Sequence, residues 1–179
     1  MISDNTKAID RASELVTRGL TDEKIIIDIV KNETDIPKKL SAELYDKVNY
    51  MCRRWMDRIA RFEIEYDFIP NIKTLQTVLI CLIESAPVFH SRFIDNHINP
   101  YWKVADYHID DVFTVKETSD LLRSADEFLL QGIPVESNVQ IKIGLFFCEG
   151  KSRLCFIFNH MCMDGGGLKL FLYNLMIVI

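Results

Sequence analysis

The stretch that decides the fold is residues 153–167, which read RLCFIFNHMCMDGGG. Its first six residues alternate, which predicts a strand with apolar side chains on both faces. One face carries Leu154, Phe156 and Phe158, and the other carries Cys155 and Ile157. We expect the strand to deliver His160 into a cleft, and the glycines at 165–167 to let the backbone turn sharply before a helix. A histidine, an aspartate four residues later and these glycines suggest acyl-transfer chemistry.

The residues from Asn159 to Gly165 resemble the H-H-x-x-x-D-G motif of an acyltransferase superfamily. That family includes chloramphenicol acetyltransferase, the condensation domains of nonribosomal peptide synthetases, and alcohol acetyltransferases. The resemblance implies that His160 is the general base, that Asp164 is a structural carboxylate and that Gly165 is the glycine of the motif. Asn159 stands where the family usually has its first histidine.

Residues 75–93 provide a second match, to the family's first long helix and the strand of type P-x-L-R-x-R-F that follows it. The apolar residues between 75 and 82 recur at helical spacing, and Pro87 closes the helix. Of the strand pattern the chain keeps Phe89, Arg92 and Phe93 and departs at His90. The resemblance covers roughly residues 53–179, which is half of a family domain.

The resemblance also implies an ion pair for Asp164, because the family's aspartate pairs with an arginine from the first strand region. Arg58 and Arg61 are the nearby candidates, and the planar guanidinium suits a carboxylate. A solvated helix face is the other interpretation of this basic run.

Residues 1–52 predict three short amphipathic helices. Gly19 ends the first, Thr21 caps the second, and Ser41 caps a third that reaches Trp55. The pattern then alternates between strands and helices: an extended segment at 59–69, a helix at 71–85, strands at 88–94, 101–104 and 112–115, a helix capped by Ser119, and a hairpin that turns at 149–151. We therefore predict an α/β fold with a mixed, largely antiparallel sheet and packed helices. The resemblance implies that residues 53–179 form one chloramphenicol-acetyltransferase-like half-domain, preceded by the helical segment 1–52.

Composition limits the partners. The net charge of −5 argues against a nucleic-acid surface. No stretch approaches the roughly 20 apolar residues of a membrane helix, and the N-terminus does not read as a signal peptide. The five cysteines are odd in number and lack C-x-x-C spacing, so we expect reduced thiols and a cytoplasmic protein.

Other chemistries compete for the same residues. His160 can instead be a strand-end histidine that is hydrogen-bonded into the core. Cys162 lies two residues from His160, which allows a cysteine nucleophile with a histidine base. His108 and Asp110 fall on one face but lack a third ligand, so we expect an exposed loop there and no metal site.

The resemblance implies an acyltransferase, of which this chain is the N-terminal part. It would move an acyl group from a CoA or carrier-protein thioester to a small-molecule alcohol or amine, most similar to the alcohol acetyltransferase branch, with no permanently bound cofactor. A family member continues into a second half with a D-F-G-W-G type motif, which is absent here. The apolar tail at 171–179 therefore predicts that a C-terminal half or a second copy covers it. The alternative is a catalytically incomplete homologue that acts as a scaffold or oligomerisation module.

Overall fold

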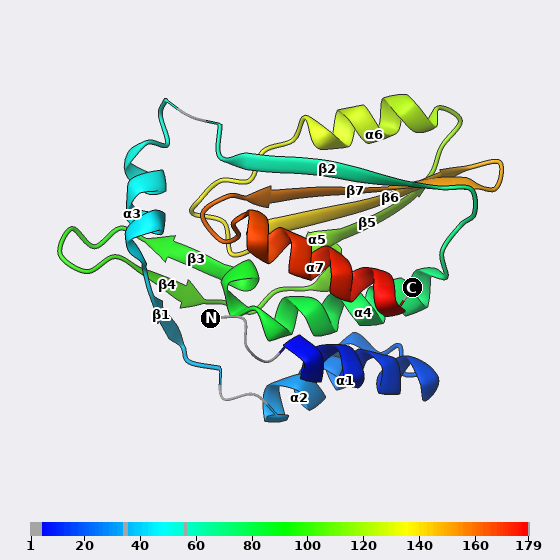
Figure 1. The fold of residues 1–179 in the computed structure, drawn as a ribbon, viewed down its shortest axis with the longest axis horizontal. Helices are drawn as coiled ribbons and strands as arrows, with labels where there is room; N and C mark the ends of the chain where they lie inside the picture. Colours follow the sequence, from blue (N-terminus) through cyan, green and yellow to red (C-terminus); the bar gives the residue numbers. More distant parts are fainter. Residues whose placement is uncertain (1–4, 34–35, 56, 179) are drawn as a thin grey trace.

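The computed structural model of the chain describes residues 5–33, 36–55 and 57–178. Its centre is a four-stranded sheet in the order β2-β7-β6-β5 (Figure 1). The strands are β2 (Ile59–Tyr66), β5 (Phe113–Glu117), β6 (Ile141–Cys148) and β7 (Lys151–Asn159). β7 is antiparallel to both neighbours, whereas β5 and β6 are parallel. The predicted α/β fold with a mixed, largely antiparallel sheet is confirmed.

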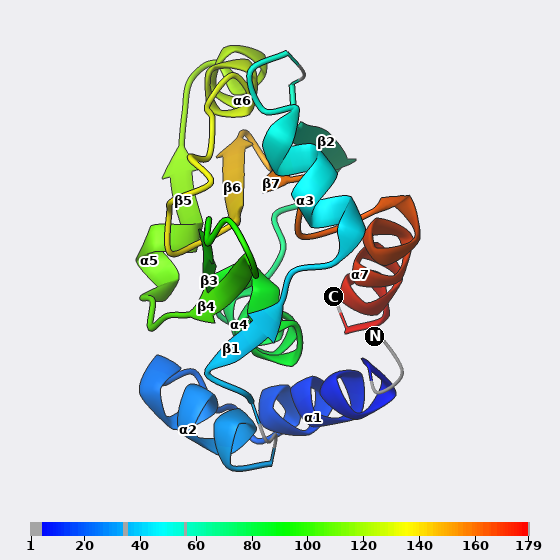
Figure 2. The same ribbon diagram turned by 90° about the vertical axis from the view of Figure 1, so that its left-hand side faces the viewer.

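Helices cover both faces of this sheet. α6 (Leu121–Leu129) lies on one face, and α4 (Ile72–Ser85) and α7 (Gly165–Val178) lie on the other. α1 (Asn5–Thr17) and α2 (Glu23–Glu33) form a further layer against α4, as Figure 2 shows. The chain also contains a short 3₁₀ helix, η1 (Pro87–His90), and a four-residue helix, α5 (Ile109–Val112).

The alternation in β7 is explained by these two layers. Its first set of apolar side chains packs toward α4 and α7, and its second set packs toward α6. The first set is Leu154, Phe156 and Phe158, and the second is Cys155 and Ile157. The predicted faces are thus confirmed, and the strand is buried on both sides because each face meets a helix layer.

The hairpin before β7 is also confirmed. Cys148 faces Lys151 in the register, so two residues close the turn. Both have positive φ, 48° at Glu149 and 80° at Gly150. This is the backbone that a two-residue turn needs to match the twist of its strands.

α4 is buried along nearly its whole length because the sheet, α1 and α2 enclose it. Asn71 caps it, since its side-chain oxygen accepts a hydrogen bond from the Thr74 N–H. Ala12, Leu15, Ile26 and Val30 from α1 and α2 belong to the same core as α4 and the sheet. Residues on both sides of position 52 therefore share one core, and the boundary there stays a prediction.

A second, three-stranded sheet lies beside the first in the order β1-β4-β3. Its strands are β1 (Lys39–Ser41), β3 (Ser91–Ile94) and β4 (Tyr101–Val104). α3 (Leu44–Met51) follows β1 and packs near this sheet (Figure 1). A small core between them contains Ala42, Phe93, Trp102, Val135 and Met161.

Several predicted boundaries are wrong. Ser41 does not cap α3, because its backbone pairs with β4, and α3 ends at Met51 rather than at Trp55. The predicted strand at 88–94 begins with η1, since Pro87 starts a helical turn. Asp120, not Ser119, caps α6 by accepting a hydrogen bond from the Arg123 N–H.

Candidate functional site

His160 is the first residue after β7, and two contacts hold it. Its backbone N–H donates to the carbonyl of Arg58 over 2.6 Å. Its Nδ1 atom lies 2.9 Å from the hydroxyl of Tyr45 in α3. Among the described residues, the other ring nitrogen has no hydrogen-bond partner. The imidazole is therefore held through Nδ1, and its Nε2 atom forms no hydrogen bond within the described residues.

Tyr45 is the residue at this site that the sequence analysis missed. The sequence of residues 1–52 contains no catalytic or binding motif. No local pattern in it indicates that α3 contacts residue 160. The structure brings them together because Tyr50 of α3 and Met161 of the turn contact the same small core. A buried hydrogen bond from the Trp102 indole to Asp46 ties α3 to β4.

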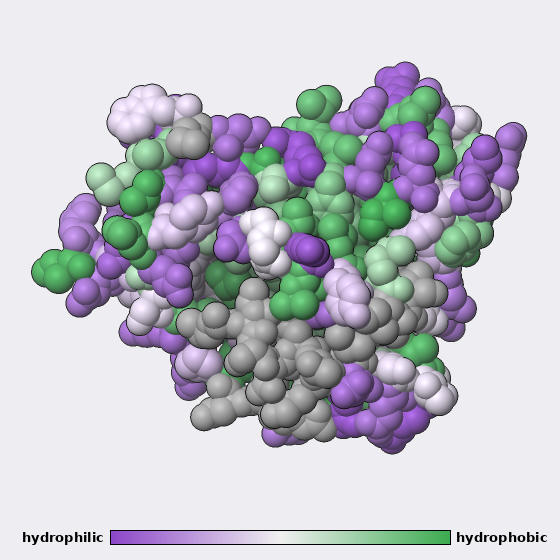
Figure 3. All heavy atoms as spheres, viewed as in Figure 1, coloured by the Kyte–Doolittle hydropathy of each residue, from purple (hydrophilic) through white to green (hydrophobic). Residues whose placement is uncertain are grey.

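The outer side of α3 is apolar. Leu44, Val48 and Met51 are exposed, and Figure 3 shows apolar side chains over this helix. Tyr45 lies on the same helix and is itself 46% exposed. The residue that contacts His160 therefore lies on a helix with one face exposed to solvent.

Arg58 joins α3 to the turn after β7. One guanidinium nitrogen donates to the Asn49 carbonyl over 3.1 Å and contacts the sulfur of Met161. Partial burial, together with nearby Arg53, lowers the pKa of Arg58, but an arginine stays charged at neutral pH. Its carbonyl accepts the His160 N–H, so Arg58 supports the histidine through both backbone and side chain.

In the described residues, Asp164 forms no ion pair with Arg58 or Arg61. Its side-chain oxygen accepts the Gly167 N–H over 2.7 Å, and its carbonyl accepts the Leu168 N–H. Asp164 is exposed and caps the start of α7, where unpaired N–H groups face a carboxylate directly before the helix. Arg61 pairs with Asp57 instead.

The glycines after Asp164 form the first turn of α7 rather than a sharp loop. A Cβ added at Gly165 would meet nothing within 4 Å, so no close approach requires a glycine at that position. We conclude that local crowding does not explain the motif-like glycine in this chain.

Asn159, which replaces the first histidine of the resembling motif, is buried in an amide network. Its Nδ2 donates to Oε1 of Gln140, and its Oδ1 accepts the Met161 N–H. The Gln140 amide nitrogen donates to the carbonyls of Ser91, Val135 and Ser137. The turn that presents His160 is therefore anchored to β3 and to the segment before β6.

Cys162 does not have the environment of a nucleophile. Its thiol donates to the Asn159 carbonyl over 2.9 Å. Burial raises the pKa of this thiol well above its usual range, so it stays protonated at neutral pH. The geometry therefore contradicts the cysteine-nucleophile interpretation.

The region of His108 and Asp110 is a short helix, α5, rather than a loop. The Asp111 carboxylate accepts the His108 N–H, and Ile109 and Val112 are buried. Within the part of the chain that the structure describes, no three His, Cys, Asp or Glu side chains are grouped to hold a metal ion. In the same residues, no helix is both long and apolar enough to cross a membrane.

The arrangement of strands and helices is similar to that of solved condensation domains. The starter condensation domain of rhizomide synthetase aligns with a TM-score of 0.62 and 12% identity, over 78% of this chain and 38% of that chain. The first condensation domain of the calcium-dependent antibiotic synthetase gives 0.63 and 16%, over 76% and 36%. This chain has a condensation-domain fold. Tallysomycin biosynthesis protein TlmII is also similar, with a TM-score of 0.65 and 11% identity over 77% and 37%.

No family model and no curated protein matches the sequence, so the comparison rests on the solved structures. The chain spans well under half the length of each of these solved proteins. The resemblance seen in the sequence is thereby confirmed at the level of the fold. The roles of His160, Asp164, Gly165 and Asn159 stay predictions.

Proposed function

We propose that this chain supplies the general base of an acyltransferase, and that His160 is that base. The observation that supports this most directly is the imidazole at the end of β7, which Tyr45 contacts at Nδ1 and whose Nε2 has no hydrogen-bond partner in the described residues. The donor would be an acyl thioester of CoA or of a carrier protein, and the acceptor a small alcohol or amine.

The reaction needs one proton to move through His160. Nε2 would take the proton from the acceptor hydroxyl or amine while that oxygen or nitrogen attacks the thioester carbonyl. The carbon–sulfur bond then breaks, and the leaving thiolate takes the proton back from Nε2. For Nε2 to have a free lone pair, Nδ1 must carry hydrogen and donate it to the Tyr45 oxygen.

The groups that complete the site would come from the C-terminal half or from a second copy. The chain matches less than half of the condensation-domain proteins compared above, and donor and acceptor contacts are expected largely outside that part. Oxyanion stabilisation, which contributes strongly to acyl transfer, would also have to come from there.

A non-catalytic scaffold is the second candidate. Two observations favour it: Asn159 is locked in a buried amide network in place of a histidine, and Asp164 caps a helix rather than pairing with an arginine. In that case the fold would be kept for assembly and His160 would be dispensable.

One experiment separates the two. Acyl transfer by the full-length gene product should fall by about 10²–10⁴-fold in His160→Ala, the range that general-base catalysis contributes. His97→Ala, which changes an exposed histidine in the loop after β3, is the matched control and should keep wild-type activity. Measurable and equal turnover in wild type and His160→Ala would exclude His160 as the base, whereas no turnover in either protein would favour the scaffold.

A further inference from the structure

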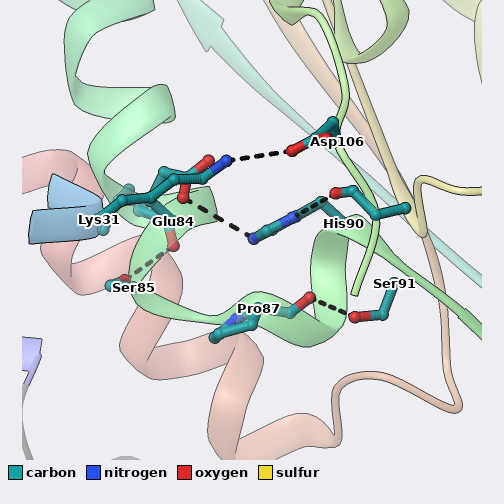
Figure 4. Close-up of polar contacts among 9 residues, drawn as sticks. Lys31, Glu84, Ser85, Pro87, His90, Ser91 and Asp106 are labelled. Atoms are coloured by element: carbon teal, nitrogen blue, oxygen red, sulfur yellow. Dashed lines mark hydrogen bonds and ion pairs between the residues drawn. The ribbon is translucent and has the colours of Figure 1, made fainter. Parts of the chain in front are cut away.

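Two titratable side chains that take no part in the proposed reaction are buried together beside α4. Glu84, near the end of α4, has 0% of its surface exposed, and His90, in η1, has 1%. The His90 Nε2 atom lies 3.9 Å from a Glu84 carboxylate oxygen, as Figure 4 shows. In the described residues, neither oxygen of Glu84 nor Nε2 of His90 has a hydrogen-bond partner. Buried polar groups without partners are rare, so this arrangement needs an explanation.

The position of one hydrogen on His90 follows from its other contact. Nδ1 lies 2.9 Å from the carbonyl of Ala105, and a carbonyl can only accept. Nδ1 therefore carries hydrogen, and Nε2 is the nitrogen that faces Glu84. If Nε2 and the carboxylate both lacked a proton, two acceptors would face each other and a charge would be buried without compensation. A single proton, on the acid or on the imidazole, removes both costs.

The groups around this pair come from three elements. α2 contributes Lys31 and Glu23, the segment before α5 contributes Asp106 and Tyr107, and α4 contributes Cys81. Burial raises the pKa of Glu84, while His90, Lys31 and the Tyr107 hydroxyl oppose that rise. By distance and angle, the Tyr107 hydroxyl is also buried without a hydrogen-bond partner in the described residues. Burial also raises the pKa of Tyr107, which keeps its hydroxyl neutral. Of the groups named here, Lys31 is the one lysine, and its side chain is partly exposed.

Two contacts attach α2 to the segment that covers the pair. Lys31 forms an ion pair with Asp106 over 3.3 Å (Figure 4), and Glu23 accepts the Ile109 N–H over 2.8 Å. His90 lies beneath this segment, because its ring and that of Tyr107 are 5.2 Å apart. Residues 105–109 are thus held by α2 on one side and by the buried pair on the other.

We propose that Glu84 and His90 together hold one proton, on one group or the other, and that this proton is a pH-sensitive latch that keeps residues 105–109 and α2 against the end of α4. Loss of the proton leaves a carboxylate buried beside a neutral imidazole. Water or Lys31 must then reach the carboxylate, and either change opens the contact between residues 105–109 and α4. The backbone carbonyls on either side of His90 accept hydrogen bonds from Gln140. The buried pair is therefore next to the amide network that anchors the His160 turn.

The sign of the pH dependence follows from proton counting. Because the pKa of Glu84 is raised on folding, its contribution to stability is present at low pH and is lost as pH rises. Well above about pH 6.5, an unfolded chain holds few protons on glutamate or histidine side chains. Under the proposal the folded pair keeps one, so the unfolding constant should rise by up to about tenfold per pH unit.

Urea unfolding of the full chain at pH 7.0, 7.5 and 8.0 tests this, with hydrogen exchange of residues 105–112 corrected for the intrinsic effect of pH. Over this pH range, the free energy of unfolding of the wild type should decrease as pH rises. Glu84→Gln keeps the shape without the titrating proton, so its unfolding constant and its exchange protection should stay flat. Glu136→Gln, at an exposed position, should behave as wild type. The same pH dependence in Glu84→Gln and wild type would overturn the proposal.

Lys31→Gln keeps the proposal testable if Glu84→Gln does not fold. Lys31 favours the carboxylate form of Glu84, so its removal should move the alkaline loss of protection to higher pH. An onset that does not move, or that moves to lower pH, would contradict the latch. Neither readout depends on acyl transfer, so the latch and the proposed function stand or fall separately.

Discussion

The Nδ2 group of Asn159 donates a hydrogen bond to Oε1 of Gln140 over 3.1 Å, and both side chains are buried. The direction of this bond is fixed, because the amide nitrogen of Gln140 is already used on three carbonyls. The position that resembles the first motif histidine is thus structural in this chain. It orients the backbone that carries His160.

Removing the Asn159 amide should therefore destabilise the fold. In Asn159→Ala, the Gln140 Oε1 and the Met161 N–H lose a buried partner, at a cost of about 1–3 kcal/mol. Urea unfolding measures the loss. Asn138→Ala, at an exposed position, should stay within about 0.5 kcal/mol of wild type. Equal stability of the two variants would show that the amide network is not important.

Tyr45→Phe should lower kcat and leave KM nearly unchanged. The variant removes only the hydroxyl that contacts Nδ1 of His160, and one hydrogen bond is worth about 2–10-fold in rate. ¹⁵N NMR of the His160 ring should show hydrogen on Nδ1 in the wild type and a mixture of tautomers in the variant. Tyr173→Phe, at an exposed site in α7, is the control. Hydrogen found only on Nε2 in the wild type would argue against Nε2 as the base.

Asp164 gives a test between a helix cap and an ion pair. As a cap, Asp164→Ala should cost about 1 kcal/mol, whereas Asp164→Asn should cost little, because asparagine caps equally well. An ion pair predicts instead that asparagine is nearly as harmful as alanine. Thermal unfolding of the two variants decides the matter.

Cys162→Ala should keep acyl transfer within a few-fold of wild type. The thiol donates to a carbonyl and stays protonated, so it offers no nucleophile. Iodoacetamide at pH 8 should accordingly leave Cys162 unmodified in the native protein, as read by peptide mass spectrometry. Rapid labelling together with loss of activity in Cys162→Ala would restore the cysteine mechanism.

The sequence predicts the elements whose signal is local. β7 alternates because two helix layers bury its two faces, and the turn at Glu149 and Gly150 has the residues that close a hairpin. α4 is recognised by its apolar spacing and its end before Pro87. In each case the deciding residues are neighbours in the chain, so pattern and structure agree.

The rest depends on contacts between distant segments. Tyr45 reaches His160 only because α3 and the turn share the core around Trp102, and nothing near residue 45 indicates this. Ser41 has the right residue type for a cap, but pairing with β4 takes its backbone. Glu84 reads as one acid at the end of an apolar run, and its burial beside His90 follows from the packing of α2 and residues 105–109.

The strand order has a consequence for how the chain folds. β6 and β7 are joined by two residues, whereas β2 ends at Tyr66 and pairs with a strand that begins only at Lys151. Closing a short loop costs less conformational entropy than closing a long one. The β6–β7 hairpin should therefore gain protected amides early in refolding, and β2 late. The strand that leads into His160 would then be formed on one edge while its other edge still lacks a neighbour.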